Sequence, residues 1–229
     1  MSQSKEASQS PESTNPEKTR WALIQAALPL FARKGFDGTT VRDVADAAGV
    51  NVSLVSYHFN GKEGLYRTCI EEFGKLRQNK TQEILQPAQT LEEFKFRFRF
   101  LVEDMLMFMI SNPYVCQIVL REVDDGLPIA KDIFEKTLMQ TYLGLVEFIQ
   151  DAKNKGFTRE SVDPLIVAML TQASVFHLMR TDKVRKAYFN DSIMDEEFKK
   201  KTVETLLDMF FFGFLNTVGK PGEERESKR

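Results

Sequence analysis

The stretch from Thr40 to Glu63 reads TVRDVADAAGVNVSLVSYHFNGKE and decides the fold of the N-terminal part of the chain. After Thr40, alanine and valine recur at the spacing i, i+3, i+4, i+7, which is one apolar face of a helix. Thr40 is a favourable N-cap for that helix because its hydroxyl can satisfy an early backbone N–H. Gly49 ends the helix, since glycine enters the left-handed conformation at little cost.

A second short helix follows the glycine turn, from about Val52 to Phe59, and Asn51 is placed to cap it. Val55 and Phe59 lie four residues apart and form the face that anchors this helix. The other face carries small residues, hydroxyls and one ring, so it can approach a base-pair edge closely. Helix, glycine turn, helix is the helix-turn-helix arrangement, whose second helix enters the DNA major groove. The same arrangement also occurs in proteins that do not bind DNA.

The runs from Phe31 to Val50 and from Ser56 to Tyr66 resemble the N-terminal domain of the TetR/AcrR family of bacterial transcriptional regulators. The resemblance covers roughly residues 16–73. It implies an all-α homodimer, with a small N-terminal helix-turn-helix domain that binds DNA. It also implies a larger helical domain that dimerises and binds a small effector, which usually releases the DNA. Asn51 stands where the family usually has serine, and Ser56 where it often has tyrosine, so the operator contacts stay open.

The resemblance and the turn residues together predict a domain order. We expect a disordered tail at 1–14, a three-helix DNA-binding domain at 15–62, a helical effector-binding and dimerisation domain at 63–218, and a disordered tail at 219–229. The N-terminal segment has no apolar signal sequence, and the longest apolar runs are too short to cross a bilayer. The sequence therefore predicts a cytoplasmic protein with no membrane partner.

One segment of the predicted larger domain gives a conflicting signal. Phe94 to Phe100 alternates phenylalanine with lysine and arginine, which taken alone indicates a strand. The residues that follow are helical in composition, and no partner strand is apparent elsewhere in the chain. We therefore predict a helix over 91–111. Further along the chain we expect one long helix over 129–154 and a mobile connection over 181–194.

The charge of the chain limits how it could bind DNA, and its two cysteines limit its redox chemistry. The 229 residues have a net charge of −2, which argues against nonspecific packaging of nucleic acid. Residues 15–66 carry six basic and five acidic side chains, so binding would depend on a few placed phosphate contacts. Cys69 and Cys116 form no motif and are predicted to be buried free thiols, with a redox pair as the alternative.

The predicted DNA contacts lie on the second helix and at the start of its neighbours. Hydroxyls can donate to phosphate oxygens, and helix N-termini can clamp a phosphate. The candidates are Thr40, Arg42, Asn51, Val52, Ser53, Ser56, Tyr57, His58 and Lys62. The alternative is that these residues are ordinary solvated surface.

Two further sets of residues concern the larger domain. The family resemblance makes a cluster of aromatic and methionine residues the wall of a pocket for an apolar effector, although plain core packing explains it equally well. The candidates are Phe100, Met105, Phe108, Met109, Phe176 and His177. The last helix has an apolar stripe wider than one core needs, which predicts a four-helix dimer interface. The candidates are Leu206, Leu207, Phe210, Phe211 and Phe214.

No motif for catalysis, a cofactor or a metal is apparent in the sequence. There is no phosphate-binding glycine loop, no nucleophile elbow and no HExxH, and neither His58 nor His177 has a partner at ligand spacing. We therefore expect a ligand-responsive DNA-binding regulator, most simply a repressor, rather than an enzyme. The alternatives are an activator, and a helical interaction module that does not bind DNA specifically.

Overall fold

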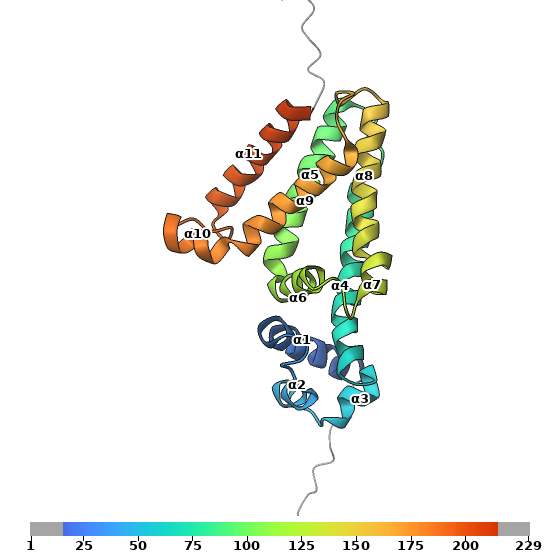
Figure 1. Ribbon diagram of the computed structural model, residues 1–229, viewed down its shortest axis with the longest axis vertical. Coiled ribbons are helices and arrows are strands. Elements are labelled where there is room, and N and C mark those ends of the chain that lie inside the picture. The colour runs from blue at the N-terminus through green and yellow to red at the C-terminus, as the bar shows by residue number, and fades with distance from the viewer. Residues whose placement is uncertain (1–15, 215–229) are drawn as a thin grey trace, which may run out of the picture. The chain divides into compact units, whose positions relative to one another are not determined.

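The computed structural model describes residues 16–214, which form helices joined by short connections, with no β-strand in this range (Figure 1). The all-α prediction is confirmed. The predicted tails at 1–14 and 219–229 lie outside the described residues. The helices are α1 (Pro16–Lys34), α2 (Val41–Ala48), α3 (Ser53–Phe59), α4 (Lys62–Ile84), α5 (Leu91–Ser111), α6 (Pro113–Asp124), α7 (Lys131–Lys136), α8 (Leu138–Asn154), α9 (Pro164–Arg180), α10 (Asp182–Phe189) and α11 (Glu196–Phe214).

The chain forms two compact units. Within the described residues, the first comprises 16–70 together with 117–129, and the second comprises 71–116 together with 130–214. The sequence placed the boundary near residue 62 and gave 117–129 to the larger domain. The difference has a physical cause, because the second half of α6 makes hydrogen bonds to α1 and α4 within the first unit.

Apolar residues at helical spacing build the core of the first unit. On α1 the residues Leu23, Ile24, Ala27 and Phe31 are buried, whereas Leu28, which the helical spacing also places on this stripe, is only half-buried. The shorter helices α2 and α3 each contribute a pair of buried residues, and the first part of α4 closes the core.

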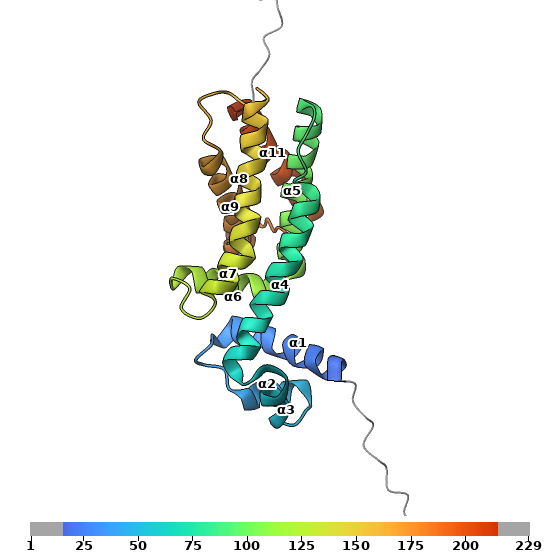
Figure 2. The ribbon, with the colours of Figure 1, turned by 90° about the vertical axis from the view of Figure 1, so that its right-hand side faces the viewer.

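In the second unit, α5 shows how a helix accommodates the alternating phenylalanines. Phe94 and Phe98 are fully buried, whereas Phe96 and Phe100 are exposed, so alternate rings fall on opposite sides of the helix. Thr90 caps α5 by accepting a hydrogen bond from the backbone N–H of Glu93 at 3.1 Å. Helix α5 runs antiparallel to residues 71–84 of α4 and to α8 (Figure 2).

Two predictions of secondary structure in the second unit are wrong. The expected long helix over 129–154 is broken into α7 and α8 at Thr137, whose φ and ψ of −123° and −73° lie outside the α-helical region. The expected mobile connection over 181–194 contains the helix α10. The carboxylate of Asp182 fixes that segment by accepting the backbone N–H of Ile193 at 2.7 Å.

Candidate nucleic-acid interface

Reciprocal hydrogen bonds fix the start of α2. The Thr40 hydroxyl accepts from the Asp43 N–H at 3.0 Å, and the Asp43 carboxylate accepts from the Thr40 N–H at 2.9 Å. This capping box lowers the pKa of Asp43, chiefly through the backbone N–H of Thr40. Thr40 stays exposed, as does Arg42 in the first turn of α2, so both can reach a backbone phosphate.

In the turn between α2 and α3, Gly49 ends α2 as the sequence predicts, whereas the N-cap position of α3 is Val52 and not Asn51. Gly49 has φ +67° and donates its N–H to the carbonyls of the last turn of α2. The side chain of Asn51 accepts from the backbone N–H of Ser53 at 2.9 Å and from its hydroxyl at 2.8 Å. Asn51 thus restrains the first turn of α3, and it also orients the Ser53 hydroxyl.

Helix α3 has one buried face and one exposed face. Val55 is fully buried and Phe59 is 6% exposed, which anchors the helix on the domain core. The Tyr57 side chain is 76% exposed and meets the half-buried His58 ring edge-on, with 4.9 Å between ring centroids. The other residues of the exposed face are Asn51, Val52, Ser53 and Ser56. The predicted contact residues on and just before α3 are therefore exposed, apart from the half-buried His58.

Lys62 is the exception among the predicted DNA contacts. Its ammonium donates to the carbonyl of Phe36 at 2.9 Å and lies 4.2 Å from the centroid of the Phe36 ring. The side chain is only half-exposed. Lys62 thus ties the start of α4 to the loop after α1, and one of its three donors is already used inside the protein.

Two side chains of α6 support the helix-turn-helix from behind. The Arg121 guanidinium donates to the carbonyls of Phe31 and Ala32 at 3.0 and 3.1 Å, and so caps the end of α1. The Tyr66 hydroxyl donates to the buried Glu122 carboxylate at 2.9 Å. Burial, followed by this hydrogen bond, raises the pKa of Tyr66. Sequence reasoning missed these residues, because their partners lie 56 to 90 positions away and leave no local pattern.

The six predicted effector-pocket residues lie in different surroundings within the described part of the chain. Met105 and Met109 are buried in the core of the second unit, and Phe100 is 43% exposed. Phe108 packs against Phe73 with 4.4 Å between ring centroids. The remaining two lie on α9, where Phe176 packs against the core and His177 is exposed.

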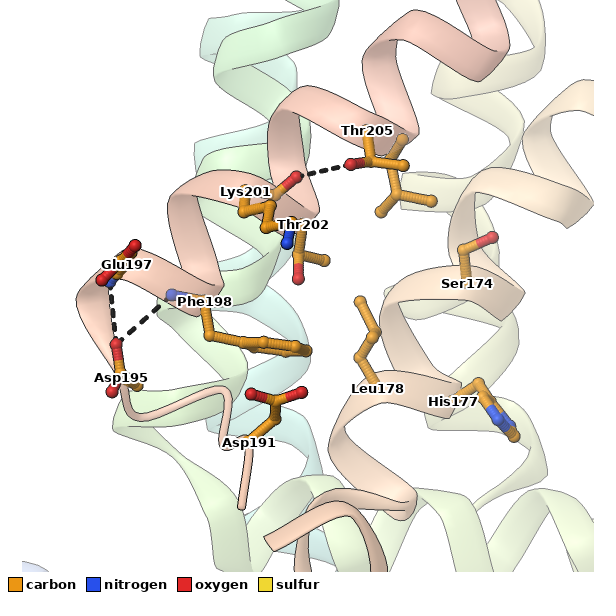
Figure 3. A pocket seen from close by; sticks show the side chains of 11 residues that line it. Ser174, His177, Leu178, Asp191, Asp195, Glu197, Phe198, Lys201, Thr202 and Thr205 are labelled. Atoms are coloured by element: carbon orange, nitrogen blue, oxygen red, sulfur yellow. Dashed lines mark hydrogen bonds between the residues drawn. The ribbon is translucent and has the colours of Figure 1, made fainter. Parts of the chain in front are cut away.

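Among the described residues of the second unit, two cavities each have a volume of about 620 Å³. One lies between α9 and α11 and includes His177 in its lining (Figure 3). The other is lined by α4, α8 and the segment after α4. In this second cavity the hydroxyl of the buried Thr81 has no hydrogen-bond partner within the described part of the chain.

The predicted dimer residues on α11 face two directions. Leu207 is buried, and Phe210 and Phe211 pack on their own core against the Phe98 ring, with centroid distances of 5.7 and 5.9 Å. Leu206 is half-exposed, and the side chain of Phe214 lies outside the described residues. The sequence stripe therefore includes residues that their own chain already covers.

A capped helix, a glycine turn and a second helix with one buried and one exposed face define a helix-turn-helix DNA-binding module. Residues 23–69 match the family model described as bacterial regulatory proteins, tetR family. The helix-turn-helix region of this chain is therefore similar to the DNA-binding domain of these transcriptional regulators.

Two relatives align with part of this chain. The chain is 33% identical to the probable HTH-type transcriptional regulator YttP of Bacillus subtilis over 122 residues, 53% of this chain and 58% of YttP. It is 35% identical to the HTH-type transcriptional repressor KstR2 of Mycolicibacterium smegmatis over 75 residues, 33% of this chain and 37% of KstR2. The alignments thus span about half the length of these relatives or less.

The fold of most of this chain is similar to that of the ketosteroid transcriptional regulator KstR2 of Mycobacterium tuberculosis. The TM-score is 0.68 at 19% identity, over 86% of this chain and 94% of that one. Within residues 16–214, no helix is both long and apolar enough to span a bilayer. The same residues contain no cluster of three or more histidine, cysteine or acidic side chains arranged to hold a metal ion.

Proposed function

We propose that this protein is a homodimeric, ligand-responsive repressor that binds a palindromic operator through α3. The observation that carries the proposal is the exposed face of α3, held outward by Val55 and Phe59. Small hydroxyl side chains allow α3 to enter the major groove closely, while Tyr57 can pack on sugar or on a thymine methyl group. Two copies would place their α3 helices in successive major grooves, about 34–36 Å apart or at a multiple of that spacing.

Dimerisation would use the faces of α9 and α11 that the single chain leaves exposed. Large apolar side chains in water mark a surface that another molecule covers. On α9 the exposed residues are Leu165, Ile166, Met169 and Leu170, and on α11 they are Met209 and Phe212. These replace Leu207, Phe210 and Phe211 as the proposed interface, and Leu206 remains at its edge.

The cavity between α4 and α8 is the better candidate for the effector. Its volume of about 620 Å³ suits a small molecule, and its lining combines apolar side chains such as Leu85 and Phe148 with hydroxyl and amide groups. The buried Thr81 hydroxyl could pair with a polar group of an otherwise apolar ligand. A ligand there would contact α4, whose first residues belong to the DNA-binding unit.

Capture of genomic DNA tests the proposal. The purified protein is incubated with fragmented DNA of its source organism at near-physiological salt, and the bound fragments are sequenced. We expect a few palindromic sites with wild type and with the control Tyr114→Ala, which removes an exposed ring from α6. We expect loss of these sites with Tyr57→Ala. Salt-sensitive background alone with wild type would contradict the proposal and favour an interaction module that does not bind DNA specifically.

A further inference from the structure

Helix α10 is firmly held, yet it buries none of its residues against the described chain. The carboxylate of Asp182 accepts from the Ile193 N–H at 2.7 Å and from the Arg185 guanidinium at 3.0 Å. Arg185 in turn lies 4.6 Å from the centroid of the Phe198 ring on α11. The helix is therefore fixed at its base, and its other side chains are free to contact something else.

The outward side of α10 is both apolar and basic. Val184, Tyr188 and Phe189 are 54%, 80% and 71% exposed, and Lys183 and Lys186 are exposed as well. Ordering a helix costs conformational entropy, which exposed rings do nothing to offset. An exposed apolar patch with a charged rim is typical of a protein interface.

The cavity between α9 and α11 has the complementary character (Figure 3). Its apolar floor includes Leu178 of α9 and Phe198 of α11, and Figure 3 shows the Phe198 ring pointing toward Leu178. Its charged lining consists of Asp191, Asp195, Glu197 and Lys201, a net charge of −2 with His177 neutral. Because Tyr188 and Phe189 are exposed, they do not fill the cavity of their own chain.

We propose that α10 of one subunit docks into the α9–α11 cavity of a second copy of this chain. Tyr188 and Phe189 would enter the cavity, and the lysines of α10 would face its acidic lining. A two-fold dimer uses the same surface on both copies, so each dimer would contain this contact twice. The inference rests on the proposed function only in requiring that the chain dimerises through α9 and α11.

A charge swap tests the docking. The first variant, Lys183→Glu/Lys186→Glu, makes α10 acidic, and the second, Asp191→Lys/Glu197→Lys, makes the cavity basic. Both spare the side chains of Asp182, Arg185 and Asp195 that hold the segment together. Each variant alone should show a dimer Kd at least tenfold weaker in analytical ultracentrifugation, because both contacts bring like charges together.

An equimolar mixture of the two variants should recover near wild-type dimerisation, since both contacts in the heterodimer pair opposite charges. The control Lys131→Glu/Lys136→Glu, which reverses two exposed lysines on α7, should leave the Kd unchanged. The variant Tyr188→Ala/Phe189→Ala should also weaken the dimer, and mixing it with either charge variant should not restore wild-type dimerisation.

These measurements distinguish failure of the docking from failure of the proposed dimer. A monomeric wild type would overturn the proposed dimer, and the docking with it. A dimeric wild type whose Kd is unaffected by the charge variants would overturn the docking alone and leave the cavity to a small molecule. Weak variants that do not recover on mixing would show that the charges act within one chain, which also overturns the docking.

Discussion

Replacing Lys62 with methionine tests whether this residue supports the DNA-binding unit or contacts DNA directly. Methionine keeps most of the apolar stem and removes the ammonium. The substitution deletes the 2.9 Å hydrogen bond to the Phe36 carbonyl and the cation–π contact at 4.2 Å. A hydrogen bond to a charged group contributes about 1.5–3 kcal/mol, and a cation–π contact at an exposed site about 0.5–1 kcal/mol.

Because Lys62 is half-exposed, we take the lower part of these ranges and expect a loss of about 2 kcal/mol in the free energy of unfolding. For a chain of this size, that corresponds to a fall of roughly 4–8 °C in Tm, measured by circular dichroism. Operator affinity should weaken because the start of α4 loosens. The slope of log K against log salt should stay the same, since no phosphate contact is lost.

Arg42→Met is the matched control, because Arg42 is an exposed basic residue of the same unit. It should leave Tm unchanged, and it should reduce the magnitude of the salt slope by about 1 for each subunit that contacts the operator. A Lys62→Met protein with wild-type Tm and a reduced salt slope would contradict the structural role of Lys62. That outcome would make Lys62 a phosphate ligand.

Three other perturbations give measurable outcomes. Tyr57→Ala should leave Tm unchanged and weaken operator binding about 30-fold or more in a fluorescence anisotropy titration, because each half-site loses roughly 1–3 kcal/mol of binding free energy. Wild-type affinity of this variant would show that Tyr57 does not contact the operator. Gly74→Ala should lower the free energy of unfolding by about 1–3 kcal/mol in urea, because the new Cβ would lie 2.3 Å from the hydroxyl oxygen of Thr137. The control Gly144→Ala places its Cβ in open space and should be neutral or stabilising. Burial raises the pKa of the Cys69 and Cys116 thiols from 9.0 to about 12. As the pH rises above 9, the thiols therefore lose their protons in the unfolded chain before they do so in the folded one. The contribution of the two thiols to the free energy of unfolding is complete below pH 9 and falls above it. Between pH 8 and 10 the loss should be about 1.4 kcal/mol per thiol, and a shallower decline in the double alanine variant would identify the thiols as its source.

The helix-turn-helix could be predicted because its determinants are local. The Thr40 cap, the left-handed Gly49 and the Asn51 side chain each act within three or four residues of their partners. Short-range rules therefore suffice to place α2 and α3. The support from Arg121 could not be predicted, since a long basic side chain at that position gives no sign of which distant carbonyls it will cap.

The dimer surface shows a second limit of sequence patterns. Along α11 the apolar residues occur as adjacent pairs, so the stripe is wide and the pattern does not tell the inward side from the outward one. The Phe98 ring decides this by packing against Phe210 and Phe211. Met209 and Phe212 are then left exposed, although both belong to the same apolar segment.

In the proposed effector response, a small change in the position of α4 would have the largest effect on DNA binding. Its early residues hold the DNA-binding unit together, through Lys62 to Phe36 and through Arg67 to the Ile129 carbonyl at 2.6 Å. A tenfold change in operator affinity requires only 1.4 kcal/mol, and one hydrogen bond to a charged group contributes about as much. A ligand that favours a position of α4 in which just one of these bonds is broken would therefore suffice for a regulatory effect. The coupling is reciprocal, so operator DNA should weaken effector binding by the same factor.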